Sequence, residues 1–296
     1  MNIIERAGSQ LGLKPSKSTI ERAIEKSSAG AASPNLPAQP EPQQILRRET
    51  RHQITLDSER LRALGFAMPG DQSSIAEEFR LIKRPLVNAA LHSDVQTAVR
   101  NRNILMVTSA RPNEGKTFVA INLAFSIASE HDVHVLLVDG DVARPTIPMA
   151  LGFEADRGLI DVVSDDSIDL ADVMIRTNIP NLAILPAGEV RAGSSELLAS
   201  SRMVRFVDDI ARRYPDRVII FDSPPVLARS EPLVLAKHVG QVVFVVEAER
   251  TSRTAIDEAI GLIGPERVGG IVLNKAPLVA VQDRFGEHYG YYYGRS

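Results

Sequence analysis

Six short apolar runs, rich in β-branched residues, alternate with helix-length segments over the C-terminal two thirds of the chain. The runs cover residues 104–108, 133–138, 182–185, 218–221, 242–246 and 271–273, and the helix-length segments include 117–130, 195–213 and 253–263. Strands that are apolar almost throughout are typical of a parallel sheet covered by helices on both faces. The alternation therefore predicts an α/β fold, in which ligands bind beyond the carboxyl ends of the strands.

The amino-acid composition excludes several classes of function. The 296 residues, 44% of them hydrophobic, suffice for a sizeable core, and a formal net charge of −3 gives no general attraction to nucleic acid or anionic lipid. The lack of cysteine excludes disulfides, thiolate metal ligands and thiol nucleophiles. Because the sequence has no leader-like start and no run of about 20 apolar residues, we expect a soluble, cytoplasmic protein.

The chain outside the alternating pattern divides into segments of different character. We expect short amphipathic helical segments over 1–27, a flexible and disordered Pro/Ala/Gln-rich linker over 28–60, a folded domain over 70–286 and a tail over 287–296. Within the folded domain a helix is expected to begin near Ser73. Pro85 is expected to end or bend that helix, since proline cannot donate a backbone hydrogen bond.

A phosphate-binding pattern follows the first strong strand. Its core, "ARPNEGKT", matches the P-loop G-x-x-x-x-G-K-[ST] except that Ala110 replaces the first glycine. Backbone N–H groups and the N-terminus of the next helix can hold a β-phosphate, Lys116 can reach the β- and γ-oxygens, and Thr117 can bind Mg²⁺. The expected nucleotide-binding residues are Arg111, Pro112, Asn113, Glu114, Gly115, Lys116, Thr117 and Phe118. A chance Gly-Lys-Thr turn is the less favoured alternative.

Aspartates follow two further strands at the same expected edge of the sheet. Asp139 and Asp141 come directly after the run 133–138, and Asp222 comes directly after 218–221, in the position of a Walker B acid. Charge at such a place is costly unless a metal or a hydrogen bond compensates it. The pair Asp139 and Asp141 alone could be an exposed turn, but together with the P-loop the three acids predict a Mg²⁺-nucleotide site.

Polar residues elsewhere carry weaker signals. Asn274 ends the last apolar run, where its amide could pair with a purine edge, although a turn-forming asparagine fits the position equally well. None of the six histidines has metal-ligand spacing, so any metal is expected to be Mg²⁺.

The C-terminus, "YGYYYGRS", gathers four of the five tyrosines of the chain. Its glycines and low aliphatic content favour an extended tail, and tethering would hold the tail near a site at roughly millimolar concentration. The tyrosines of this tail are Tyr289, Tyr291, Tyr292 and Tyr293. A disordered Gly/Tyr-rich end used for adhesive contacts is the alternative.

Taken together, these motifs resemble those of the bacterial tyrosine kinases of exopolysaccharide synthesis (BY-kinases), and most closely the exosortase-linked, XrtA-associated tyrosine autokinases. The likeness runs from about residue 73 to the C-terminus and includes "SARPNEGKTFVAINLA", "VLLVDGDVARP", "SSELLAS", "VIIFDSPP", "VVFVVEAERT" and "VLNK". It implies a P-loop NTPase-like fold of the MinD/ParA-like superfamily and an ATP- and Mg²⁺-dependent protein-tyrosine kinase that regulates exopolysaccharide polymerisation and export.

The resemblance also implies roles for the site residues. Lys116 would bind phosphate, while Thr117, Asp141 and Asp222 would hold Mg²⁺. Asp139 would accept the proton of the attacking tyrosine, and the expected phosphoacceptors are Tyr289, Tyr291, Tyr292 and Tyr293.

A ring-like homo-oligomer and autophosphorylation in trans are implied in the same way. The family's oligomerisation motif, Glu-x-x-Arg-x-x-Arg, matches Glu77 and Arg80 but has Lys83 in third place, which keeps the charge and loses the planar fork.

Beyond further copies of the chain, the implied partners are a membrane chain-length-determinant protein as activator and a cognate tyrosine phosphatase, without nucleic acid. The activator would recruit the protein to the inner face of the cell membrane.

Two other functions stay open. One is a MinD/ParA-type ATPase switch, in which a lysine usually stands where this chain has Arg111. The other is a nucleotide-gated scaffold of the export machinery.

Overall fold

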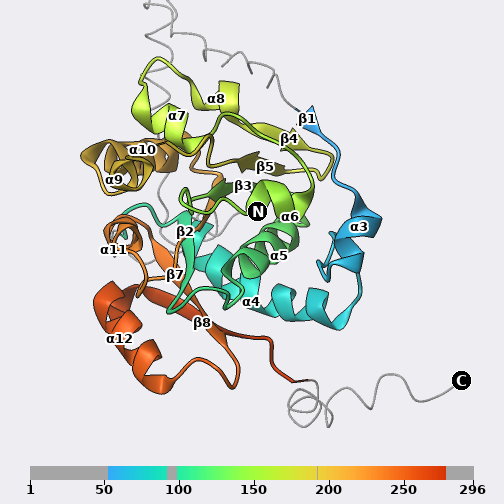
Figure 1. Cartoon of the computed structure of the whole chain (residues 1–296). Helices are drawn as coiled ribbons and strands as arrows, with labels where there is room; N and C mark the ends of the chain where they lie inside the picture. The colour runs from blue at the N-terminus through green and yellow to red at the C-terminus, as the bar shows by residue number, and fades with distance from the viewer. Residues whose placement is uncertain (1–52, 92–98, 192, 278–296) are drawn as a thin grey trace, which may run out of the picture. The chain divides into compact units, whose positions relative to one another are not determined.

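An eight-stranded sheet forms the centre of the described part of the chain, residues 53–91, 99–191 and 193–277 of the computed structural model (Figure 1). Its strands are β1 (Gln53–Ile54), β2 (Ile104–Ser109), β3 (His134–Asp139), β4 (Ile175–Thr177), β5 (Leu182–Leu185), β6 (Arg217–Asp222), β7 (Gln241–Glu247) and β8 (Val268–Asn274). They lie in the order β1-β4-β5-β3-β6-β2-β7-β8, and all neighbours are parallel except β4 and β5. The predicted, mostly parallel sheet is confirmed.

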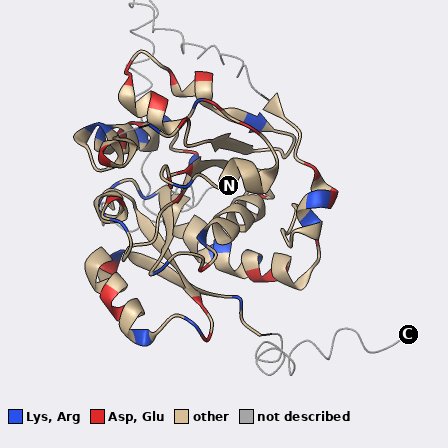
Figure 2. Cartoon of the chain, in the orientation of Figure 1, with Lys and Arg blue, Asp and Glu red and all other residues tan. Residues whose placement is uncertain are grey.

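The two faces of the sheet carry separate apolar cores. In β2, Ile104 and Met106 belong to one core and Leu105 and Val107 to the other, and all four side chains are fully buried. This division follows from the strand period of two residues, and it explains why the central strands are apolar throughout. Figure 2 shows the strands almost without charged residues, which lie instead on helices and connections.

Helices cover both faces, as predicted. One core holds α3 (Ser58–Ala63), α4 (Ser74–Leu91), α5 (Lys116–Ala128) and α6 (Ile147–Leu151). The other holds α7 (Leu159–Ser164), α8 (Leu170–Val173), α9 (Ser194–Leu198), α10 (Ser201–Arg213), α11 (Glu231–Ala236) and α12 (Arg253–Ile263), with the short 3₁₀ helix η1 (Pro265–Arg267) following α12. Among the residues described, no helix combines the length and apolar character that crossing a membrane requires.

The helix expected over 195–213 is divided into α9 and α10. Ser200 lies between them in an extended conformation and accepts a hydrogen bond from the backbone N–H of Met203. A serine in this geometry caps a new helix N-terminus rather than continuing the preceding helix.

The segment before α4, residues 53–73, is part of the fold, and we call it the strap. The linker expected over 28–60 therefore overlaps an ordered segment at its C-terminal end. β1 pairs with β4 at the edge of the sheet, and Leu56 and Leu61 are buried in the core. The expected segments 1–27 and 287–296 lie outside the described residues.

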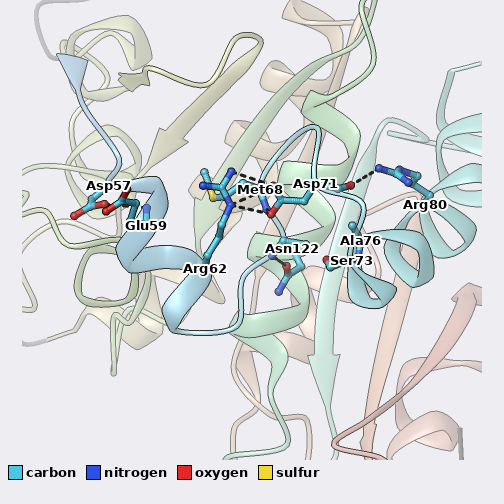
Figure 3. Close-up of polar contacts among 10 residues, drawn as sticks. Asp57, Glu59, Arg62, Met68, Asp71, Ser73, Ala76, Arg80 and Asn122 are labelled. Carbon is cyan, nitrogen blue, oxygen red and sulfur yellow. Dashed lines mark hydrogen bonds and ion pairs between the residues drawn. The ribbon is translucent and has the colours of Figure 1, made fainter. Parts of the chain in front are cut away.

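Polar contacts close the strap against α4 and α5 (Figure 3). The guanidinium of Arg62 pairs with the carboxylate of Asp71 at 3.0 Å, and the same carboxylate accepts the backbone N–H of Met68 at 3.0 Å. Asn122 of α5 accepts the N–H of Ala67 at 2.8 Å. These contacts place the neighbouring Phe66 on the helix that follows the P-loop.

Contrary to expectation, α4 does not end at Pro85 but continues to Leu91. Proline inside a helix costs about 3 kcal/mol, whereas each fully buried apolar side chain contributes about 1.5–3 kcal/mol. Phe79, Leu86 and Val87 of α4 are all buried in the core that α5 shares. Packing on both sides of Pro85 therefore outweighs the lost hydrogen bond.

Lys83 lies on the buried face of α4 and is 7% exposed. Its ammonium donates to the carbonyl of Ser126 at 2.7 Å and pairs with Glu130 at 2.6 Å, at the C-terminus of α5 where positive charge is favourable. The ammonium is thus engaged within its own chain, and the expected part of Lys83 in an oligomer interface stays a prediction. Glu77 and Arg80 pair with each other and are partly exposed, and their part in an oligomer stays a prediction.

Candidate active site

The predicted P-loop lies between the end of β2 and the first turn of α5. Gly115 precedes the helix with a φ of +94°, and Asn113 also has a positive φ of +66°. A Cβ at position 115 would lie 1.9 Å from the side-chain nitrogen of Asn274. Only glycine therefore fits there, and the backbone amides that follow it can approach a phosphate closely.

A cleft of about 620 Å³ opens beside this loop. Its lining includes Lys116, Thr117, Phe118, Asp141, Arg229 and the strap residue Phe66, which stacks on Phe118 with ring centroids 5.3 Å apart. The volume lies within the range of small-ligand sites. Of the other predicted nucleotide-binding residues, Pro112, Asn113 and Gly115 also line the cleft.

Thr117 and Asp222 meet at the back of the cleft. The hydroxyl of Thr117 donates to Asp222 Oδ2 at 2.5 Å and lies 2.9 Å from the hydroxyl of Thr146. Asp222 is 1% exposed, and its Oδ1 has no hydrogen-bond partner among the described residues. Burial raises the pKa of Asp222 to about 7, although the Thr117 hydrogen bond and the charge of Lys116 oppose the rise.

Asp139 lies opposite Asp222 on the neighbouring strand and is fully buried. Its Oδ2 accepts the backbone N–H groups of Thr146 and Ile147, both at 3.1 Å, while its Oδ1 has no partner within the described ranges. Burial, followed by the charge of Asp222, raises the pKa of Asp139 well above its usual range. The expected proton-accepting role stays a prediction, and the aspartate that lines the cleft is Asp141.

The oxygen atoms of Thr117, Asp141 and Asp222 fit the preferences of Mg²⁺. Magnesium takes hard oxygen ligands and usually keeps several waters and substrate phosphates in its shell. Oδ1 of Asp222 has no partner among the described residues, and burial raises the pKa of Asp141. Both observations mean that the negative charge of these carboxylates is poorly stabilised, and a bound cation would stabilise it. No group of three His, Asp or Glu side chains in the described regions could form an all-protein cage, so phosphate oxygens would complete the shell.

The other side of the P-loop is anchored by buried Glu114, which is 2% exposed. One carboxylate oxygen accepts the backbone N–H of Arg111 at 2.7 Å, and the other accepts the hydroxyl of Thr251 at 2.5 Å. Thr251 follows β7, within the run "VVFVVEAERT". The sequence marked this run only through the resemblance and did not assign Thr251 a role.

The end of β8 holds the same loop. Asn274 donates its side-chain N–H to the carbonyl of Glu114 at 2.9 Å, and Lys275 donates to the carbonyl of Asn113 at 2.7 Å while pairing with Glu247 at 3.3 Å. We call Glu114, Thr251, Asn274 and Lys275 the P-loop clamp. Since the amide nitrogen of Asn274 carries two N–H donors, one N–H and the oxygen remain beside the bond to the loop, and the purine contact stays a prediction.

The AAA domain family matches residues 103–263, a stretch that contains the P-loop and all three aspartates. The chain belongs to the AAA domain family. Membership establishes a nucleotide-binding fold, in agreement with the geometry of the cleft.

Relatives of this AAA domain include bacterial tyrosine kinases. The tyrosine-protein kinase YwqD of Bacillus subtilis is 28% identical over 76% of this chain and 90% of YwqD. The tyrosine-protein kinase wzc of Salmonella typhimurium is 29% identical over 70% of this chain, which spans only 28% of wzc. Among solved structures, the kinase domain of the Escherichia coli tyrosine kinase ETK has a TM-score of 0.57 and 27% identity, covering 68% of this chain and 77% of that one.

These similarities confirm the predicted resemblance to the bacterial tyrosine kinases. The finer likeness to the exosortase-linked group stays a prediction. The four expected phosphoacceptors, Tyr289, Tyr291, Tyr292 and Tyr293, lie outside the described residues.

Proposed function

We propose that this chain is an ATP-dependent protein-tyrosine autokinase that phosphorylates the four tyrosines of its own tail, residues 289–293. The observation that carries the proposal is that Lys116, Thr117 and Asp141 line one cleft at the carboxyl edge of the sheet, where the hydroxyl of Thr117 also donates to buried Asp222. The names of the kinase relatives and the tyrosine-rich end of the chain support the same reaction.

The protein contributes mainly positioning and charge compensation, which is what phosphoryl transfer requires. Lys116 and the N-terminus of α5 hold the β- and γ-phosphates of ATP. Thr117, Asp141 and Asp222 would hold Mg²⁺, which when bound neutralises the phosphate oxygens. The oxygen of the attacking tyrosine then bonds to the γ-phosphorus as the bond to the bridging oxygen breaks.

The phenolic proton leaves late in this reaction, because the reference pKa of tyrosine is about 10 and that of aspartate about 3.9. By resemblance the acceptor is Asp139. Its full burial and its two backbone hydrogen bonds require the turn at Thr146 to open before a tyrosine can reach it.

The cellular role proposed for the reaction is control of exopolysaccharide polymerisation and export. Copies of the chain would assemble as a ring through α4, with Glu77 and Arg80, and phosphorylate one another in trans. Each phosphotyrosine adds roughly −1.5 to −2 charges, which would expel the tail and loosen the ring. A membrane chain-length-determinant protein as activator and a tyrosine phosphatase as antagonist complete the proposal.

Mass spectrometry of the full chain after incubation with Mg·ATP tests the reaction. We expect phosphate on Tyr289–Tyr293, its loss in Lys116→Ala and its retention in Lys237→Ala, which changes a lysine on the exposed surface. Release of free phosphate without phosphotyrosine would instead indicate an ATPase switch. Absence of both would indicate a nucleotide-gated scaffold.

A further inference from the structure

The segment after β6, residues 223–230, forms a fixed wall of the cleft, and we call it the β6 wall. Its backbone continues the pairing with β2 beyond the end of β6. Three N–H groups of the wall donate to the β2 side, Ser223 to Val107 at 3.0 Å, Val226 to Ser109 at 2.8 Å and Leu227 to Ala110 at 3.2 Å. The hydroxyl of Thr108 donates to the carbonyl of Pro224 at 2.7 Å. The wall is therefore tied to the strand that carries the P-loop.

Arg229 lies near the end of this wall and lines the same cleft as Lys116 and Asp141. Its side chain is 41% exposed, and within the described residues it pairs with Glu231 at 3.8 Å. That separation is too long for a hydrogen bond, so the N–H donors of the guanidinium stay available to a ligand. Asp141 lines the same cleft; burial raises its pKa, and the positive charges of Lys116 and Arg229 oppose that rise.

We propose that Arg229 is a further catalytic residue, whose guanidinium binds the γ-phosphoryl oxygens of ATP during transfer to tyrosine. The inference rests on the proposed kinase function and adds a second protein cation to Lys116. The bond from the γ-phosphorus to the bridging oxygen breaks, and a bond to the tyrosine oxygen forms. The electron pair leaves with ADP, and the phenolic proton passes to an aspartate.

The placement of Arg229 suits this step for a physical reason. Negative charge lies on the equatorial γ-oxygens and grows on the bridging oxygen during transfer. A cation contributes most to the rate when it is held in place before the reaction, since little reorganisation is then needed. Lys116 is fixed by α5, and Arg229 is carried by the hydrogen-bonded β6 wall on another side of the cleft.

Autophosphorylation of the full chain tests the proposal through Arg229→Ala and Arg229→Lys. The matched control is Arg253→Ala, whose side chain is 92% exposed on α12. We expect the alanine variant to lose about 100-fold or more in single-turnover rate while its affinity for a fluorescent ATP analogue changes little. The lysine variant should recover part of the rate, because it keeps the charge and loses the fork. The control should match wild type.

A second readout separates catalysis from a structural role. Binding of ADP with aluminium fluoride, which mimics the transferring phosphoryl group, should be lost in Arg229→Ala while binding of ADP alone is kept. The inference fails if the alanine variant phosphorylates itself within about 3-fold of wild type, or if its loss of rate is matched by an equal loss of ATP affinity. Wild-type protein that makes no phosphotyrosine would overturn the proposed function, and the inference with it.

Discussion

The two sides of the P-loop are held in opposite ways. Toward β7 and β8, buried Glu114 is joined by hydrogen bonds to the half-buried side chains of Thr251 and Asn274. Toward β3 and β6, Asp139 and Asp222 each keep a carboxylate oxygen that lacks a partner among the described residues. The hydrogen-bonded side fixes the shape of the loop, whereas the aspartate side holds carboxylates whose negative charge is poorly stabilised. Polar groups that lack partners are expected where a site is built for a ligand.

The largest change in autophosphorylation rate should come from removing the negative charge of Asp222 on the aspartate side. Asp222→Asn keeps the volume and an oxygen that can accept from Thr117 but removes the negative charge. We expect autophosphorylation to fall by about 100-fold or more, because the proposed Mg²⁺ site loses a negatively charged ligand. Without nucleotide at about pH 8, the free energy of unfolding should rise, since no charge is then buried at this position.

Rate assays and urea denaturation measure the two halves of that prediction. Asp257→Asn, at a position that is 71% exposed, is the matched control and should change neither quantity. An Asp222→Asn variant that lost both activity and stability would contradict the contrast between the two sides.

The raised pKa values of the two buried aspartates should make the stability of the fold depend on pH. Asp222 has a pKa of about 7 in the fold against a model value of 3.8, and the pKa of Asp139 is also raised. Between about pH 4 and about pH 7, Asp222 therefore holds its proton in the folded chain but loses it in the unfolded chain, and Asp139 shifts in the same direction. The contribution of each carboxyl to the free energy of unfolding should fall by up to about 1.4 kcal/mol per pH unit as pH rises through this window.

Urea denaturation of the nucleotide-free protein across that window measures the slope. Asp222→Asn should flatten it, and Asp257→Asn should not. A wild-type chain whose stability rises steadily from about pH 4 to about pH 7 would show that other groups outweigh these two aspartates.

A smaller effect is expected on the hydrogen-bonded side. Glu114→Ala leaves the N–H of Arg111 and the hydroxyl of Thr251 without their acceptor and should cost about 1–3 kcal/mol of unfolding free energy. Glu114→Gln keeps an acceptor for one of them and should cost less. Thermal denaturation compares the variants, and equal stability of Glu114→Ala and wild type would argue against the clamp.

The smallest effect is expected at the exposed end of the P-loop clamp. Lys275 is 46% exposed, so its pair with Glu247 is screened by solvent, and Lys275→Ala should cost less than about 1 kcal/mol. The affinity for ATP should fall only slightly, because the bonds from Thr251 and Asn274 remain. A loss as large as that of Glu114→Ala would show that Lys275, rather than Glu114, dominates the clamp.

The two sides of the P-loop also differ in how well the sequence predicts them. The strands and the P-loop follow from residues that are neighbours in sequence, and their expected positions agree with the structure within a few residues. The clamp could not be predicted, because Thr251 lies 137 positions from Glu114 and neither residue is unusual in its local pattern. The short strands β1 and β4 were missed because two or three residues make no apolar run.

Two features of α4 depend on packing that its own sequence does not reveal. From the sequence, Pro85 is expected to end or bend the helix; the helix does not end there, because the buried residues beyond it belong to the core shared with α5. Lys83 lies on the buried face of α4, where its ammonium reaches the carbonyl of Ser126 and the carboxylate of Glu130 at the end of α5. Neither partner could be identified before the two helices were seen to pack.

The brevity of β1 affects how copies of this chain can associate. A long open strand offers a row of unpaired backbone groups, onto which a strand from another molecule can add without limit. Among the described residues, β1 covers the edge at β4 with Gln53 and Ile54, so this part of the chain presents little template for such growth. A contact between copies formed by these residues would rest on side chains more than on added strands, which suits a closed assembly better than a fibre.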